Sequence, residues 1–437
     1  MNAHTQALDP EKDRRYIKLF LSLFFALVLF AYRETWPLDL SALYFAARFY
    51  HDGQFDQIFP IGTAFLWDPD AYPRAWRLLA AGEISRFDSP TLYLTPFVYP
   101  PIWAAVLAPM AGVLSFKLFW LAWLSIYAGC FVWMFFLSYR LVRPTRLSMP
   151  AWILILLPFV VFGAAPQLAL NLGQPQILVA MLTLQSFVWL SEGKPRRAGA
   201  ILALAAAIKL TPALFALIFL MERDWKALGW FAAVGAALAG ASVAVTGWPL
   251  HDQFLRQLAL LDGQVLISRI NLSLNAVLTG AGSLFNGASS QLQPDPGFIA
   301  EPAWVSWVMR LALILSPIAI FVTTRDHGRR KRTWLRIMMV AMITLFLSPL
   351  GWLHYLVLPI FLLPGLLEFS GRRWVVPLLG LVGVGLSLPV YFLLALYPST
   401  FLLQVAMNVG ICGAIVAALV ATSRGAACRG NAPSVRV

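Results

Sequence analysis

Four polar residues lie close to breaks in the apolar segments of this chain. Asp39 follows Pro37 at the start of a short amphipathic stretch, and Gln174, Lys209 and His354 each lie near a Gly or Pro that interrupts an apolar run. A carboxylate can act as a general base, whereas lysine and histidine can stabilise an anionic leaving group. Together these residue types favour chemistry on a lipid-linked phosphate.

The break at 209–212 is defined by the lengths of its flanking segments. The apolar runs at 198–209 and 212–221 hold about twelve and ten residues. Twelve helical residues rise about 18 Å, well short of the roughly 30 Å hydrocarbon core, so the turn lies within the membrane. Its backbone must line a cavity or be buried in protein. Thr211 is predicted to cap the next helix, with Pro212 at its first position.

Two further segments have the same arrangement, NLGQPQ at 171–176 and SPLGWLH at 348–354. We expect three helix N-termini to face one cavity in the outer half of the bilayer, where their positive ends suit a phosphate. Lys209, Gln174 and Thr211 are therefore predicted to bind the phosphate of a donor.

Each of these residues also has an ordinary structural explanation. Asp39 can cap the helix that it begins, and Lys209 can extend its ammonium to the membrane surface. His354 can belong to an interfacial aromatic belt, and Gln174 can satisfy the backbone freed by the break. The local sequence leaves both sets of explanations open.

Composition identifies an integral membrane protein. The 437 residues are 60% hydrophobic and 12% charged, with repeated apolar runs of spanning length. The net charge of +13 comes from basic residues in short loops between apolar runs, where they set topology, so nucleic acid is not an expected partner. The three cysteines, Cys130, Cys412 and Cys428, are not placed to form a disulfide framework.

Several catalytic motifs are missing from the sequence. It contains no glycine-rich phosphate loop, His-Glu-x-x-His motif, paired-cysteine motif or serine elbow. ATP-driven transport, zinc proteolysis and serine hydrolysis therefore have no support, and we expect neither a metal site nor a cofactor.

The distribution of Lys and Arg predicts one transmembrane domain over 1–437 with about twelve spans. A basic N-terminus precedes the first span at 16–32, so 33–96 is expected to be an outer loop with interfacial helices. A second outer loop is expected at 247–302, and a cytoplasmic tail at 422–437. The other spans are expected at 118–139, 151–170, 176–190, 198–209, 212–221, 227–246, 303–323, 335–348, 354–367, 374–396 and 401–421.

The segment 97–115 is apolar but does not fit this topology as a crossing. A full span there would reverse every later loop, and Pro100, Pro101 and Pro109 interrupt it. We therefore expect a re-entrant or broken element on the outer face.

A set of short motifs in this order resembles glycosyltransferase family 87, the membrane mannosyl- and arabinofuranosyltransferases of the GT-C class. The resemblance covers roughly 15–370. The motifs are Asp39 with Tyr44 in a helix that ends at Gly53, the FVYPP element at 97–101, Gly173 with Gln174, the turn at 209–212, Asn271 to Ser273, and Ser348-Pro349 with Trp352 and His354.

The resemblance implies an all-α polytopic GT-C-type bundle of about twelve transmembrane helices. It also implies a polyprenyl-phosphate sugar donor, a mannose or arabinofuranose, and an envelope glycolipid or polysaccharide acceptor. Asp39 corresponds to the family's catalytic aspartate and His354 to its functional histidine. The residues expected to line the substrate site are Tyr44, Tyr99, Asn271, Ser273 and Trp352.

The chain departs from the family pattern at two positions. Gln176 stands where members often have Asn, and Leu210 stands where the family's Lys-Pro-x-Pro turn has its first Pro. Both changes preserve the turn but leave the donor's identity open.

The predicted reaction is an inverting transfer on the outer face of a bacterial inner membrane, with Asp39 as the base and both chain termini in the cytoplasm. The alternative is a lipid or sugar transporter or flippase, because broken helices with ionisable residues also build transport sites. We find no inverted repeat in the sequence. A non-catalytic scaffold is a third possibility, which the intramembrane Lys209 disfavours.

Overall fold

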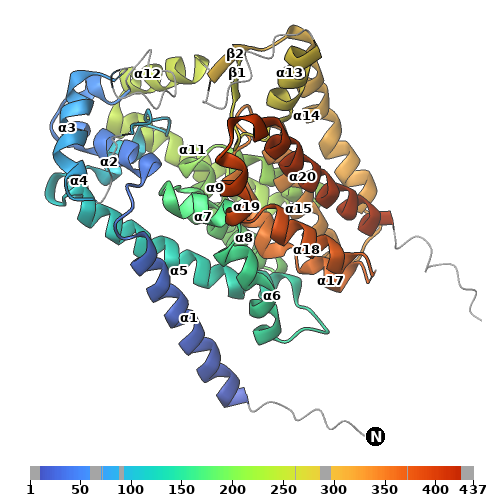
Figure 1. Ribbon diagram of the computed structural model, residues 1–437. Helices are drawn as coiled ribbons and strands as arrows, with labels where there is room; N and C mark the ends of the chain where they lie inside the picture. The colour runs from blue at the N-terminus through green and yellow to red at the C-terminus, as the bar shows by residue number, and fades with distance from the viewer. Residues whose placement is uncertain are drawn as a thin grey trace, which may run out of the picture.

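The computed structural model describes residues 10–59, 70, 72–87, 93–260, 262–285, 297–371 and 373–424. Helices make up most of this part of the chain. In Figure 1 the first helix, α1 (Pro10–Tyr32), extends away from the body of the molecule. The helical architecture and the membrane character of the chain agree with the prediction from sequence.

Four helices in the described ranges are long and apolar enough to cross a membrane: α5 (Phe116–Val142), α11 (Trp225–Thr246), α14 (Ala303–Thr324) and α20 (Phe401–Arg424). Other apolar segments form shorter helices, so the count of twelve crossings stays a prediction. The other helices between α5 and α20 are α6 (Met149–Val161), α7 (Ala164–Asn171), α8 (Gln176–Ser191), α9 (Pro195–Ile208), η3 (Thr211–Phe215), α10 (Ala216–Met221), α12 (Trp248–Ala259), α13 (Leu274–Phe285), α15 (Arg329–Leu347), η5 (Leu353–Leu356), α16 (Val357–Leu362), α17 (Gly365–Phe369), α18 (Val375–Gly385), α19 (Leu388–Ala395) and η6 (Pro398–Thr400).

The segments predicted as continuous spans at 151–170 and 374–396 each contain a break. The two breaks pair with one another, because Ala164 N donates to Leu386 O at 2.7 Å and Leu388 N donates to Phe162 O at 2.6 Å. Each interrupted helix therefore satisfies the free backbone groups of the other, as a water-poor environment requires. No single proline or glycine in the sequence reveals such a pairing.

The predicted turn at 209–212 is present, but Thr211 is not the N-cap. Leu210 occupies that position, and the helix start has no side-chain cap hydrogen bond. The chain enters the 3₁₀ helix η3 first and becomes α-helical in α10. The capping prediction was wrong because Leu210 already has helical backbone angles, which places Thr211 inside the first turn.

The helix that carries Asp39, α2 (Leu38–His51), is buried along most of its length. It packs against α3 (Arg74–Ile84), α4 (Ile102–Val113) and α5, close to the short 3₁₀ helix η1 (Phe55–Gln57). Protein thus covers the faces of α2 that the sequence suggested could lie in the membrane interface.

The segment 97–115 contains α4, a twelve-residue helix. Twelve residues rise about 18 Å, too little for a full crossing. Arg48 of α2 holds its C-terminal end by donating to Ala111 O at 3.1 Å and Gly112 O at 3.3 Å. The re-entrant or broken character of 97–115 and its side of the membrane stay predictions.

A small antiparallel pair of strands, β1 (Gln264–Ile267) and β2 (Gly297–Ala300), interrupts the helical pattern, with Gln264 opposite Ala300. The expectation of an all-helical protein missed this pair. Strands of four residues are too short to show a clear two-residue alternation in the sequence.

A buried ion network ties α10, α14 and α15 together. Glu222 pairs with both Arg332 and Arg336 at 2.7 Å, and Arg336 Nε donates to the Thr324 hydroxyl at 2.9 Å. The Arg336 side chain is 1% exposed, so its charge depends on this partner. Loss of one member of such a network leaves an uncompensated charge.

We expect Glu222→Gln to destabilise the protein by about 3 kcal/mol, because the buried Arg336 would lose its countercharge. Thermal unfolding in detergent measures the effect as a fall in Tm. Asp326→Asn is the matched control, since Asp326 is 86% exposed and its loss should leave Tm unchanged. Equal Tm values for Glu222→Gln and the control would contradict a stabilising role for the network.

Candidate active site

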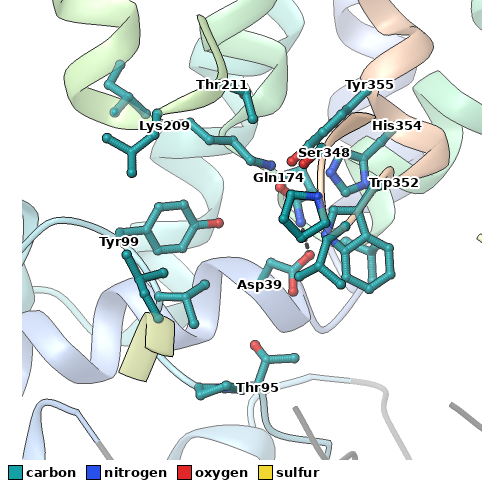
Figure 2. Close-up of a pocket in the computed structure, with 18 of the residues that line it drawn as sticks. Asp39, Thr95, Tyr99, Gln174, Lys209, Thr211, Ser348, Trp352, His354 and Tyr355 are labelled. Atoms are coloured by element: carbon teal, nitrogen blue, oxygen red, sulfur yellow. Dashed lines mark hydrogen bonds between the residues drawn. The ribbon is translucent and has the colours of Figure 1, made fainter. Parts of the chain in front are cut away.

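The breaks in the helices surround one cavity of about 330 Å³. Asp39, Gln174, Lys209 and His354, which lie far apart in the sequence, all line it (Figure 2). Thr211, Tyr99 and Trp352, also predicted from sequence, line it as well. The rest of the lining is Thr95, Pro96, Val98, Pro100, Leu172, Ile208, Leu210, Phe254, Leu258, Leu266, Ile270, Ser348, Pro349, Leu350 and Tyr355.

Asp39 lies in the first turn of α2 with its carboxylate at the cavity wall. The helix start has no side-chain cap hydrogen bond, so the carboxylate is not used as an N-cap. Instead, Gln174 Nε2 donates a hydrogen bond to Asp39 Oδ2 (Figure 2). The backbone N–H of Asp39 donates to Leu172 O at 2.8 Å, which fixes the start of α2 against the 172–174 loop.

Gly173 makes this arrangement possible. Its φ is +65°, and a Cβ there would lie 2.7 Å from Pro37 Cβ and 2.8 Å from Leu40 Cβ. Only glycine accepts both the left-handed backbone and the close approach. Tyr127 of α5 donates its hydroxyl hydrogen to Gly173 O at 3.1 Å, so the loop that presents Gln174 is held from both sides.

The surroundings of Asp39 tune its acidity. Burial raises its pKa to about 6, while the hydrogen bond from Gln174, the charge of Lys209 and a hydrogen bond from Thr95 act in the opposite direction. The carboxyl group is therefore mostly ionised at neutral pH, and its pKa is close enough to neutrality to accept a proton efficiently.

Lys209 ends α9 and directs its side chain into the cavity (Figure 2). Its Nζ lies 4.5 Å from the centre of the Tyr355 ring. The ammonium group therefore lies against the cavity wall and does not extend to a membrane surface. Asp39 and Lys209 supply the formal charges among the residues that line the cavity.

Trp352 and His354 form an aromatic wall. Their rings are nearly parallel, at 17°, with centres 6.1 Å apart, and His354 meets Tyr355 edge-on at 5.3 Å. Among the described residues, neither His354 Nε2 nor Gln174 Oε1 has a hydrogen-bond partner, although both atoms are buried. Buried polar atoms of this kind normally find a partner, and these two are available to a substrate.

Asn271 supports this wall from outside the cavity. Its Oδ1 accepts from Gly351 N at 2.8 Å and from Ser273 N at 3.2 Å, and its Nδ2 donates to Leu266 O at 2.8 Å. Leu353 N donates to Ile270 O at 2.7 Å. These bonds fix the 350–353 segment, which carries Trp352 into the cavity.

Three residues that the sequence placed at the substrate do not line the cavity: Tyr44, Asn271 and Ser273. Tyr44 donates its hydroxyl hydrogen to Leu114 O at 2.8 Å and packs on the ring of Phe116. Its hydrophobic surroundings, rather than any ligand, explain its place on the buried α2. The sequence alone does not separate a tyrosine in this role from one at a site.

Thr95, Ser348 and Tyr355 complete the polar lining, but were not proposed as site residues from the sequence. Tyr355 is within hydrogen-bonding reach of the side chains of Ser348 and Thr211, and Thr95 is within reach of Asp39. Thr95 lies in an extended segment without a motif, so no local signal marks it. The proximity of Ser348 and Tyr355 to His354 in the chain was the available signal.

In the described ranges, no cluster of three or more His, Cys, Asp or Glu residues is arranged to hold a metal ion. The polar groups of the cavity are instead one carboxylate, one ammonium, one imidazole and several amide or hydroxyl groups. Such a set can accept a proton on one side and stabilise an anion on the other.

The fold and the cavity define a helical membrane protein with an internal polar site. The model of "Glycosyltransferase family 87" matches residues 97–349 of the chain. The chain belongs to this family, and it is a membrane glycosyltransferase. The resemblance seen in the sequence motifs is thereby confirmed.

Characterised relatives are also similar over most of the chain. A polyprenol-phosphate-mannose-dependent alpha-(1-2)-phosphatidylinositol mannoside mannosyltransferase of Mycobacterium tuberculosis is 28% identical over 74% of this chain and 75% of its own length. The protein of the same name from Mycolicibacterium smegmatis is 29% identical over 69% of each chain. No solved structure matches.

Gly351 offers a direct test of the support behind the aromatic wall. A Cβ at this position would lie 2.1 Å from Leu345 O and 2.7 Å from Ser273 N. We expect Gly351→Ala to displace the 350–353 segment, to cost about 1–3 kcal/mol of stability and to lower transfer activity at least tenfold. A sugar-transfer assay and thermal unfolding in detergent measure the two effects.

Gly380 in α18 provides the control, because nothing lies within 4 Å of a Cβ built there. Gly380→Ala should keep full activity and an equal or higher Tm. If Gly351→Ala also retained full activity, the 350–353 segment would not need this close packing.

Proposed function

We propose that this glycosyltransferase transfers a sugar, with mannose favoured, from a polyprenyl-phosphate donor to a hydroxyl group of an envelope glycolipid or polysaccharide. The two mycobacterial relatives, which are named for polyprenol-phosphate-mannose and for phosphatidylinositol mannoside, support the donor class and a glycolipid acceptor. The observation that carries the proposal is that the buried carboxylate of Asp39 and the ammonium of Lys209 line the same cavity. This combination meets the needs of a base and of a departing phosphate.

The leaving phosphate is assigned to the side of Lys209. Lys209 contributes a full positive charge, and the hydroxyl group of Thr211 lines the cavity beside it. Gln174 lines the same cavity, but its amide nitrogen donates to Asp39. Electrostatic stabilisation of this kind matters most when negative charge develops on the leaving group.

The acceptor hydroxyl is assigned to the side of Asp39. As the oxygen of the acceptor forms its bond to the anomeric carbon, its proton passes to the Asp39 carboxylate. The bond from the anomeric carbon to the phosphate oxygen breaks on the opposite face, with inversion, and its electron pair leaves with the polyprenyl phosphate. The hydrogen bond from Gln174 orients the carboxylate.

The aromatic wall is assigned to the sugar. The parallel rings of Trp352 and His354 and the nearby ring of Tyr99 present flat apolar surfaces to the cavity. Flat apolar surfaces suit the C–H face of a pyranose or furanose, while the buried Nε2 of His354 suits one of its hydroxyl groups. The topology expected from the basic loops places this chemistry on the outer face of the membrane, with both termini in the cytoplasm.

Asp39→Asn tests the base. We expect its rate of sugar transfer to fall by roughly 10² to 10⁴, because the amide cannot accept the proton of the acceptor. The measurement is the release of polyprenyl phosphate by protein purified in detergent, where a transporter would release none because no second compartment exists. Asp252→Asn is the control, since Asp252 is an exposed acid of α12 paired with Arg256. Full activity of Asp39→Asn would remove this residue from its role.

The pH dependence of kcat/KM gives an independent test of the environment of Asp39. The carboxyl group must be ionised to act as a base and its pKa is about 6. We therefore expect kcat/KM to fall about tenfold per pH unit as the pH drops below about 6. The other titratable groups at the cavity are Lys209, His354, Tyr99 and Tyr355.

Gln174→Leu should move the acid limb of the pH profile, where kcat/KM falls, to higher pH. The lost hydrogen bond stabilises the ionised carboxylate, so its removal raises the pKa of Asp39. Activity at pH 6 should then suffer more than activity at pH 8. Gln264→Leu, which changes an exposed glutamine of β1, should leave the limb in place. An unshifted limb in Gln174→Leu would contradict the contribution of Gln174.

A further inference from the structure

A second groove lies at the C-terminal end of α5, and none of its residues lines the catalytic cavity. Its volume is about 750 Å³. Residues near the C-terminal end of α5, the start of α6 and the end of α8 form it. They are Trp133, Phe136, Tyr139, Arg140, Arg143, Pro144, Met149 and Glu192.

The charged end of the groove has an excess of positive charge. Glu192 pairs with Arg140 at 2.5 Å and with Lys194 at 2.8 Å. The guanidinium of Arg143 uses Nε to donate to Arg140 O at 3.3 Å, and its terminal nitrogens have no hydrogen-bond partner among the described residues. Three cations against one carboxylate leave a net charge of +2 around the mouth.

The other end of the groove is apolar and lies nearer the middle of α5. Trp133 is 44% exposed and its ring lies 6.1 Å from that of Phe136. Its indole N–H donates to Gln185 Oε1 at 3.0 Å, which leaves the ring face as the accessible surface. From Trp133 to Arg143 the helix rises about 15 Å, half of the hydrocarbon core and so the depth of one leaflet.

Two carbonyl groups at the C-terminal end of α5 already accept hydrogen bonds. Arg143 N donates to Tyr139 O at 2.7 Å, and Arg330 Nη1 donates to Arg143 O at 2.9 Å. The positive N-terminal end of α6, which begins at Met149, lies at the groove. This helix end favours a negative group in the groove.

We propose that this groove binds one anionic glycerophospholipid of the bilayer. Its phosphate lies between Arg140 and Arg143, and one acyl chain lies along Trp133, Phe136 and Met149. Basic pockets between membrane helices bind anionic headgroups in this way. A zwitterionic lipid is disfavoured because its own cation would meet the excess positive charge.

The lipid site is separate from the sugar-transfer site and does not depend on the proposed mechanism. Tyr127, about midway along α5, contacts the loop that carries Gln174, whereas the groove begins at Trp133 and continues toward the C-terminal end of the helix. A bound lipid would join α5, α6 and α8 at this corner. Because it binds the folded protein, it should also raise Tm.

Native mass spectrometry of the full chain in detergent tests the proposal. Phosphatidylglycerol and phosphatidylcholine with identical acyl chains are titrated separately, and the wild type should retain one phosphatidylglycerol in preference to phosphatidylcholine. The Arg140→Gln/Arg143→Gln double variant should bind phosphatidylglycerol roughly 30-fold more weakly, from about 1 kcal/mol for each basic residue near an anionic headgroup. Glu192 keeps Lys194 as its partner in this variant, which protects the fold.

Arg146→Gln is the matched control, because it removes one charge from the same loop without lining the groove. It should retain wild-type affinity. A phosphatidylglycerol with a diazirine in its acyl chain should label Trp133, Phe136 or Met149, and the double variant should lose this label. Undiminished binding by the double variant, labelling elsewhere, or preferential displacement by polyprenyl phosphate would each overturn the assignment.

Discussion

The exclusion of water from a membrane interior governs this structure, because every backbone group freed by a break in a helix must find a partner within the protein. The molecule meets this requirement by pairing breaks with one another. Ala164 N donates to Leu386 O, and Leu388 N donates to Phe162 O. Asp39 N donates to Leu172 O. Each pairing joins segments that are far apart in the sequence.

The same pairings explain why the polar side chains meet. A break in a helix allows a polar residue to lie at membrane depth while its backbone remains satisfied, and the partner of that break then determines what the residue faces. Gly173 brings Gln174 to Asp39, and the bonds between Asn271 and Gly351 bring Trp352 to the opposite wall. The catalytic cavity is thus a consequence of how the chain satisfies its backbone.

Charged groups occur in three different arrangements in this structure. In the cavity, Asp39 and Lys209 are held in an enclosed space where their interaction is strong. Away from it, Glu222 neutralises the buried Arg336, and Arg140 and Arg143 form an open groove with excess positive charge. The cavity suits catalysis, the Glu222–Arg336 pair stabilises the fold, and the groove suits a lipid headgroup.

The sequence by itself determined that the chain is a helical membrane protein, that it breaks at 171–176, 209–212 and 348–354, and that it resembles its family. These properties depend on local composition, apolar run length and the placement of Gly and Pro, all of which are visible along the chain. Asp39, Gln174, Lys209 and His354 were identified for the same reason.

The tertiary structure alone decided which of these residues share a cavity and which do not. Tyr44, Asn271 and Ser273 belong to motifs, yet packing places them behind the cavity wall, and Thr95 lines the cavity without any motif. The breaks at 162–164 and 386–388 exist because each supplies the other's hydrogen bonds. Contacts between segments more than a hundred residues apart depend on three-dimensional packing, to which the local pattern of a sequence gives no direct access.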